Sequence, residues 1–220
     1  MVTTWAPRAV LAIWNDCAPG REDEFERWYQ DEHLPERLSI KGFRVGRRYS
    51  AVEAPKQYLT TYEVDCLEVL TAPDYLQRLA HPTECTAAIM NGGFVNAVRA
   101  ICERDTPRGP VRGSFVLTVA VDDPAAGQVL KAMAAGVQLT SQLTHSEIWH
   151  AAHTRAGTVS AETRLRGPDA TIAACLALEF LRAQPALRYA DTLAAAYPEF
   201  QIGVFELMCT LRREDLQIRR

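Results

Sequence analysis

Runs of apolar residues, each about as long as a strand, recur along the whole chain. In the first half they lie at 9–15, 43–51, 58–64 and 96–103. Between the first and second runs, and again between the third and fourth, apolar residues recur at helical spacing instead. The first half therefore predicts the order βαββαβ, which is one ferredoxin-like unit.

The second half of the chain repeats this order. When the two halves are aligned, Cys102 falls on Cys209. The segment 104–112 contains two prolines and a glycine, and it is predicted to link two units, residues 1–105 and residues 113–213. In the second unit we expect strands at 114–121, 143–152, 171–180 and 201–211, and helices at about 124–135 and 185–195.

Several of these strands are apolar on both faces. In the first strand, for example, Leu11 lies between Val10 and Ala12, and sheets that are buried on both faces read in this way. The helices of a ferredoxin-like unit cover one face of its sheet, so a second sheet must cover the other. We therefore predict an α+β protein in which two tandem ferredoxin-like units pack their antiparallel sheets into a dimeric α+β-barrel arrangement. We expect the barrel to close within the chain, with a further homodimer contact, although a second copy could supply the same cover.

The segment 20–37, which reads GREDEFERWYQDEHLPER, predicts an amphipathic helix. Phe25, Trp28, Tyr29 and His33 share one face of this helix, and the opposite face is charged. A side chain that titrates near neutral pH, placed among aromatic residues at a helix end, is a candidate for proton chemistry. The same position suits a purely structural histidine, because the helix dipole stabilises a cation there by about 0.3–1 kcal/mol.

Two consecutive arginines lie on the predicted strand 43–51. Arg47 and Arg48 point to opposite faces of the sheet, so one of the two must point inward. An inward arginine can hold a carboxylate or an enolate. It can equally pair with an acid of the protein such as Glu63.

The two predicted units differ in two segments. The first unit is longer by roughly one helical turn around 32–37. The second unit instead has a longer loop between its middle strands, at about 154–169. This difference suggests one working site, in the first unit, and one supporting unit, although neutral drift after duplication would leave the same trace.

The second unit contains a histidine-rich strand, HSEIWHAAH. His145 and Glu147 share a face of this strand, and His150 and His153 follow. A His-x-Glu pair can act as an acid–base dyad or as two metal ligands, and it can also be a polar patch at a sheet edge. No further ligand is visible in the sequence, so no metal site is predicted.

Composition and charge narrow the classes of function. The chain has 220 residues, of which 48% are hydrophobic and 23% charged, and its net charge is −3. This is an ordinary globular balance, and it disfavours a nucleic-acid partner. The chain has no run near the roughly 20 apolar residues of a membrane helix and no signal-peptide pattern, so we expect no membrane partner and a cytoplasmic location. The six cysteines form no CxxC motif and are expected to be free thiols.

Two segments of the first unit resemble a known family. The segment 28–49, which reads WYQDEHLPERLSIKGFRVGRRY, is similar to EthD-like proteins of the dimeric α+β-barrel superfamily, and so is 58–86, with YLTTYEV and APDYLQRLAHPTECT. The resemblance covers about 10–104, and the second unit shares only the order of its elements. It implies paired ferredoxin-like units and small-molecule chemistry, usually without a cofactor. Members of the superfamily include cyclases, lactone isomerases, cofactor-free monooxygenases and haem-binding enzymes.

The first hypothesis is a cofactor-independent enzyme of the lyase, isomerase or cyclase type, acting on a small apolar carbonyl or lactone compound, cyclic compounds included. His33 would be the general acid or base, and Glu32 or Asp31 would tune its pKa. Arg47 or Arg48 would hold an oxyanion. A non-catalytic ligand-binding or assembly protein is the alternative, and haem binding through His33 or His150 is a weaker one. The wall of the substrate site would be formed by Trp14, Trp28, Tyr29, Tyr49 and Tyr62.

Overall fold

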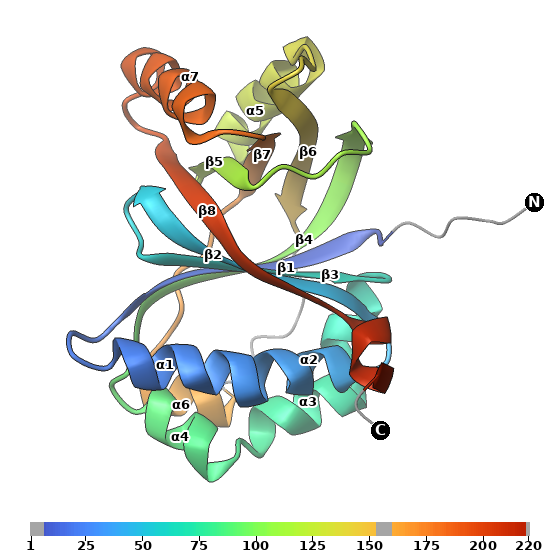
Figure 1. The fold of residues 1–220 in the computed structure, drawn as a ribbon, viewed down its shortest axis with the longest axis vertical. Helices are drawn as coiled ribbons and strands as arrows, with labels where there is room; N and C mark the ends of the chain where they lie inside the picture. Colours follow the sequence, from blue (N-terminus) through green and yellow to red (C-terminus); the bar gives the residue numbers. More distant parts are fainter. Residues whose placement is uncertain (1–6, 153–159, 219–220) are drawn as a thin grey trace, which may run out of the picture.

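The computed structural model describes residues 7–152 and 160–218, and these residues form a closed β-barrel flanked by helices (Figure 1). The strands are β1 (Ala9–Cys17), β2 (Phe43–Glu53), β3 (Tyr58–Val64), β4 (Phe94–Arg108), β5 (Phe115–Val121), β6 (Leu143–Ala151), β7 (Ala174–Phe180) and β8 (Gln201–Arg212). Their order around the barrel is β1-β3-β2-β8-β5-β7-β6-β4, and all neighbours are antiparallel.

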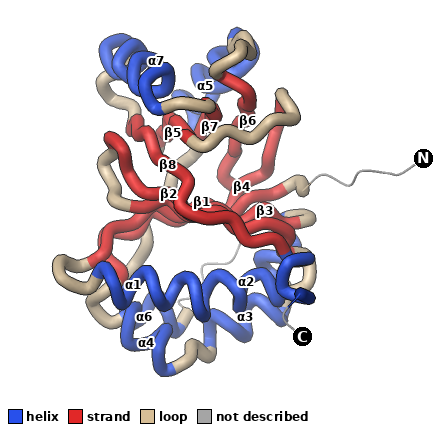
Figure 2. The backbone as a smooth tube through the Cα atoms, viewed as in Figure 1, coloured by secondary structure: helices blue, strands red, loops and turns tan. Residues whose placement is uncertain are grey.

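The helices lie in two layers outside the barrel (Figure 2). The first layer contains α1 (Glu22–Trp28), η1 (Tyr29–His33), α2 (Leu34–Ser39), η2 (Leu67–Thr71), α3 (Pro73–Ala80) and α4 (Glu84–Met90). The second contains α5 (Pro124–Gly136) and α7 (Ala183–Ala196), and η3 (Arg213–Ile218) ends the described chain beside α2. The short helix α6 (Ala161–Arg166) comes from the second half but lies against α3 and α4 of the first (Figure 1). None of the described helices combines the length and the hydropathy that crossing a bilayer requires.

Two strand pairs join the halves of the chain. β2 pairs with β8, and β4 pairs with β6. Each half contributes four strands and has the predicted order βαββαβ, so the barrel closes within one chain. This confirms the predicted α+β fold class, while the exact division into residues 1–105 and 113–213 stays a proposal.

The strand β4 is longer than the sequence predicts. The pattern places its end at 103 and a linker at 104–112, whereas the strand runs to Arg108. The physical reason is pairing, because Arg104 lies opposite Trp149 of β6 in the seam that closes the barrel. A strand in such a seam stays extended for as long as its partner needs hydrogen bonds.

The predicted helix at 20–37 is present, but it is not a uniform α-helix. At η1 it widens into a π turn, in which the N–H of Leu34 donates to the carbonyl of Tyr29, five residues earlier. Pro35 accounts for this widening, because it has no N–H and its ring would clash with the carbonyl four residues before it in an α-helix. Single π turns of this kind occur often at functional sites.

The predicted helical stretch between the third and fourth strands is split into α3 and α4. Pro82 lies in the break, and a proline cannot continue an α-helix. Thr83 then caps α4, because its hydroxyl accepts a hydrogen bond from the N–H of Thr86 at 3.0 Å.

Three clusters of buried apolar side chains hold these layers together. One lies between the first helical layer and β1–β4, and another lies between α5, α7 and β5–β8. The third fills the barrel, where the rings of Trp14 and Trp149 lie 6.3 Å apart. The strands therefore bury both faces, as their apolar pattern predicts.

Gly46 lies where β2 packs against α2, so a substitution at Gly46 tests this packing. A Cβ at Gly46 would lie 2.7 Å from Leu34 Cδ1 and 2.9 Å from Leu38 Cδ2, which is closer than packed carbon atoms approach. Gly46→Val should therefore lower the free energy of unfolding, measured by urea denaturation, by about 1–3 kcal/mol. Gly136→Ala is the control, because nothing lies within 4 Å of its Cβ. Equal losses in both variants would contradict the close approach.

Candidate functional site

The sheet separates the predicted site residues into two groups. Alternation along β2 turns Arg48 toward the helices, where it meets Tyr29, and turns Arg47 into the barrel, where it meets Glu63. The chain therefore contains two separate places of interest, a helix-side site and the barrel interior. Trp28, Tyr29, His33 and Tyr62 lie on the side of Arg48, whereas Trp14 and Tyr49 lie in the barrel on the side of Arg47.

His33 is buried in the helix-side site, with 4% of its surface exposed. Its ring stacks on Trp28, with ring centroids 4.3 Å apart, and it meets Tyr29 at 5.2 Å. Burial lowers the pKa of His33 well below its usual value, and the charges of three nearby arginines lower it further. The imidazole is therefore neutral at pH 7.

Glu32, the predicted partner of His33, points to α4 instead. Its carboxylate accepts a hydrogen bond from the Thr86 hydroxyl at 2.8 Å and another from the Thr83 hydroxyl. The Thr86 hydroxyl oxygen in turn accepts a hydrogen bond from Trp28 Nε1 at 3.0 Å. Glu32 therefore holds the indole on which His33 stacks, and it acts on the imidazole only through that ring.

Arg48 is a deeply buried charge, with 1% of its surface exposed. Its guanidinium carbon lies 4.0 Å from the ring centroid of Tyr29 and 5.4 Å from that of Tyr58. Its Nε and Nη2 have no hydrogen-bond partner, and no acid among the described residues forms an ion pair with it. The rings attract the cation but leave its charge unpaired.

Unpartnered polar atoms gather around Arg48 and His33. Tyr29 and Tyr62 both feel the charge of Arg48, and burial nevertheless raises the pKa of both phenols, so both keep their protons. Buried polar groups in proteins are nearly always hydrogen-bonded, so a cluster of unpartnered ones marks a place suited to a polar ligand. The atoms are the hydroxyl oxygens of Tyr29 and Thr60, which lie beside each other, the hydroxyl oxygen of Tyr62, His33 Nδ1, and Arg48 Nε and Nη2.

The second half of the chain reaches this site through α6. Glu162 Oε1 lies 2.5 Å from Arg37 Nη2 in a buried ion pair, and Arg166 pairs with Asp169 at 2.6 Å. The described part of the loop predicted at about 154–169 therefore packs against the first half. The sequence analysis missed Arg37, Glu162 and Arg166, because a contact between residues 125 positions apart leaves no local signal.

Inside the barrel, at one end, arginines and glutamates form a network of ion pairs. The pairing of Arg47 with Glu63, which the sequence analysis gave as the structural alternative, is present. Burial raises the pKa of Glu63, but the surrounding arginines outweigh it and hold the pKa below its usual value. Arg47 is therefore already paired with a carboxylate of the protein and has no free charge for a ligand. The contacts join Arg47 with Glu63, Arg104 with Glu63 and Glu147, and Arg112 with Glu63 and Glu179.

His145 and Glu147 belong to the same network. His145 Nε2 lies 3.3 Å from Glu147 Oε2, and its Nδ1 lies 2.6 Å from the carbonyl oxygen of Gly109. Glu147 also accepts a hydrogen bond from Trp149 Nε1 at 2.8 Å. Burial raises the pKa of Glu147, but the hydrogen bond from His145 and the charge of Arg104 lower it far more. The predicted contact is thus present, but both of its members are occupied by other groups of the protein.

The other two histidines of the histidine-rich strand are further possible ligands for a metal ion. His150 Nε2 lies 3.7 Å from Asp105 Oδ2, and His153 lies outside the described residues. Within the described part of the chain, no group of three or more His, Cys, Asp or Glu side chains is arranged to hold a metal ion.

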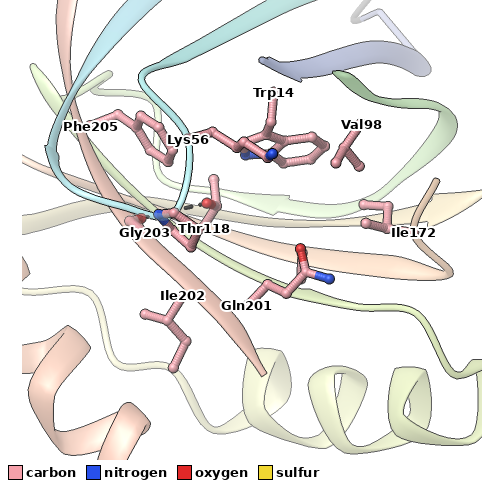
Figure 3. Close-up of a pocket in the computed structure, with 11 residues that line it drawn as sticks. Trp14, Lys56, Val98, Thr118, Ile172, Gln201, Ile202, Gly203 and Phe205 are labelled. Carbon is pink, nitrogen blue, oxygen red and sulfur yellow. Dashed lines mark hydrogen bonds between the residues drawn. The ribbon is translucent and has the colours of Figure 1, made fainter. Parts of the chain in front are cut away.

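The other end of the barrel interior holds an apolar pocket (Figure 3). The cavity has a volume of only about 20 Å³, which is roughly the space that one water molecule needs. At its rim, Lys56 Nζ lies 3.5 Å from Asp16 Oδ2. Trp14 therefore lines a different cavity from the one that would surround His33. The lining includes Trp14, Val98, Ala120, Ile172 and Phe205.

Comparisons with known proteins show a shared fold. The chain is similar to the solved structure of an anthrone oxidase-like protein, with 12% identity and a TM-score of 0.60 over 93% of this chain and 92% of that chain. It is also similar to a candidate monooxygenase from Fusobacterium nucleatum, with 8% identity and a TM-score of 0.53 over 93% of this chain and 94% of that one. A candidate monooxygenase from Lactobacillus acidophilus matches with 6% identity and a TM-score of 0.50 over 94% and 97% of the two chains.

No protein-family model and no curated protein sequence matches the chain. At identities this low, the structural likenesses show the fold alone. The shared fold is that of the dimeric α+β barrel, which confirms the predicted fold class. The chemistry must therefore be argued from the residues of the site.

His33→Gln should reduce the loss of stability in acid. The pKa of His33 in the folded protein lies below the unfolded value of about 6.5, so the unfolded state binds the proton more readily. Stability is then fully present above about pH 6.5 and is lost as the pH falls, by up to about 1.4 kcal/mol per pH unit. Urea denaturation at several pH values should show a smaller slope for the variant.

The control is His81→Gln, because His81 is exposed and its replacement should keep the slope of the wild type. A slope for His33→Gln as steep as that of the wild type would contradict a neutral, buried His33.

Proposed function

We propose that the helix-side site is the active site of a cofactor-independent enzyme of the lyase, isomerase or cyclase type. Its substrate would be a small carbonyl or lactone compound with a largely apolar body. One observation carries this proposal. A neutral histidine and an arginine without an acid partner, His33 and Arg48, lie in one buried cluster with unpartnered atoms.

The proposed reaction is a proton transfer next to a carbonyl group. His33 removes a proton from the carbon beside the carbonyl, and the electron pair of that C–H bond moves to the carbonyl oxygen. Arg48 stabilises the charge of the resulting enolate. The proton then returns from the imidazole to another atom of the same substrate, which gives an isomer, a closed ring or a departed leaving group. The atoms and electrons of this reaction balance without an oxidant or a metal.

The other members of the cluster have supporting roles in this proposal. Tyr29 and Tyr62 keep their protons and can donate hydrogen bonds to the substrate oxygen. Trp28 forms the wall behind His33, and Glu32 positions that wall through Thr86. Of the residues predicted from the sequence, Trp14, Arg47 and Tyr49 fall outside this role because they face the barrel interior.

A non-catalytic ligand-binding or assembly protein is the second candidate, and one observation favours it. His33 is only 4% exposed and is covered by Trp28, so a substrate must part these side chains before the proton can move. A protein that only encloses a ligand has no need of an accessible base. The two candidates differ in whether a bound compound exchanges a proton with solvent.

Haem binding through a histidine receives less support. An axial ligand binds the iron through a ring nitrogen that opens onto space for the porphyrin, whereas His33 is packed against Trp28 and Tyr29 with only 4% of its surface exposed. His150, the other predicted ligand, lies beside Asp105 at 3.7 Å. These surroundings do not fit a haem, so no step of the proposed reaction uses one.

The proposal includes a cytoplasmic location and a small molecule, with no nucleic acid or membrane, as the partner. All six cysteines are free thiols, which is typical of proteins from a reducing compartment. A homodimer is also part of the proposal, although a barrel closed within the chain does not depend on a second copy to cover its sheet. Light scattering would measure that assembly state.

Hydrogen–deuterium exchange tests the proposed reaction. In D₂O, the wild-type protein should exchange the hydrogen beside the carbonyl of at least one compound in a panel of small cyclic ketones and lactones, followed by NMR. His33→Gln should lower the rate at least about 100-fold, the usual contribution of a general base, while its circular dichroism spectrum stays unchanged.

The control is His145→Gln, a change to a histidine on the barrel side of the sheet, which should keep the exchange rate of the wild type. A panel without any exchange by the wild type would leave the binding protein as the better candidate. Loss of exchange in His145→Gln alone would place the chemistry in the barrel.

A further inference from the structure

Arg48 differs from the arginines that lie closest to it in the helical layer. Arg37 is as buried as Arg48 but has Glu162 at 2.5 Å, and Arg166 has Asp169 at 2.6 Å. Arg48 has no such partner among the described residues. Two of these three cations are therefore neutralised by the protein itself, and the third is not.

An unpaired charge in a protein interior is costly, because the charge loses its hydration and gains nothing in exchange. The contact of Arg48 with the face of Tyr29, at 4.0 Å, offsets part of that loss. It does nothing for Nε and Nη2, which remain without acceptors. Water molecules could satisfy these donors, but they would not neutralise the charge. A negatively charged group would do both.

The groups beside Arg48 are also donors. The hydroxyls of Tyr29 and Thr60 are buried beside each other, and the buried hydroxyl of Tyr62 has no hydrogen-bond partner. Tyr62 feels the charges of both Arg48 and Arg37 and lies close to Tyr29. Arg48 forms no ion pair with an acid among the described residues, so the donors of this set match the oxygens of an acidic group on a ligand.

We propose that the helix-side site binds a cyclic or aromatic monoanion, whose ionised oxygen pairs with Arg48 while its ring lies among the aromatic side chains of the first helical layer. The ligand is a monoanion because a single negative charge neutralises the one unpaired cation, Arg48. Phe25, Trp28 and Tyr58 supply the apolar surroundings that a flat ring prefers. This proposal rests on the location given under Proposed function, but it does not depend on proton transfer by His33.

Benzoate and benzamide are matched probes of this proposal, because they share a shape and differ in charge. In a buffer low in chloride, about 10 mM benzoate should raise the melting temperature of the wild type by at least about 3 °C, since a ligand that binds only the folded state stabilises it. Benzamide at the same concentration should give no shift. Equal shifts, or no shift with benzoate, would overturn the proposal.

Arg48→Met and Arg37→Met form a matched pair of variants. Replacing an unpaired buried charge by an apolar side chain of similar length is neutral or stabilising, whereas removing one member of a buried ion pair is strongly destabilising. Without ligand, Arg48→Met should therefore melt at or above the temperature of the wild type, and it should lose the benzoate shift. Arg37→Met should melt at least about 5 °C lower, because Glu162 loses its closer partner and keeps only Arg166 at 3.7 Å. If both variants melt equally low, Arg48 is a structural residue and the proposal fails.

Different results would refute the proposed anion site and the proposed reaction. Loss of proton exchange in His33→Gln tests the reaction, whereas loss of the benzoate shift in Arg48→Met tests the anion site. A benzoate shift in a protein that exchanges no proton would support the anion site and refute the reaction. Proton exchange on a neutral ketone, without any benzoate shift, would refute the anion site and support the reaction.

Discussion

Backbone pairing of β2 with β8 and of β4 with β6 is the constraint on which the rest of the structure depends. These two seams leave the sheet without a free edge, which a half-chain would expose to other strands. They also fix the face that each strand turns inward. A slip of one residue along β2 would exchange the positions of Arg47 and Arg48. Arg47, which now pairs with Glu63 in the barrel, would then lie among the aromatic rings on the helix side.

Arginines on the two sides of the sheet differ in whether their charge is paired. In the barrel, arginines such as Arg47 and Arg112 meet glutamates, and the charges balance. On the helix side Arg48 meets rings and hydroxyls, and its charge is left over. A balanced network serves stability and rigidity, whereas an unbalanced one sacrifices stability for the ability to bind. This contrast, more than any motif, separates the candidate site from the barrel interior.

Much of the architecture could be predicted because it depends on local patterns. Apolar runs gave the strands and the closed barrel, and alternation already placed Arg47 and Arg48 on opposite faces. Which of the two meets His33 could not be predicted, because strand register decides it across the barrel. Trp14 and Tyr49 were assigned to the wall beside His33 for the same reason. The π turn before Pro35 had a local signal, whereas the docking of α6 had none.

The ion pair between Arg37 and Glu162 joins two positions 125 residues apart in the chain. Each half carries one member of it, so the helical layer over β1–β4 is complete only when both halves are present. If the tandem arrangement began as two identical copies, it has since lost its modularity. Recombination that replaced either half with a homologous one would have to bring both the acid and the base, or it would leave a buried charge stranded. The two halves therefore depend on each other for the pairing of a buried charge, even though each has the same order of strands.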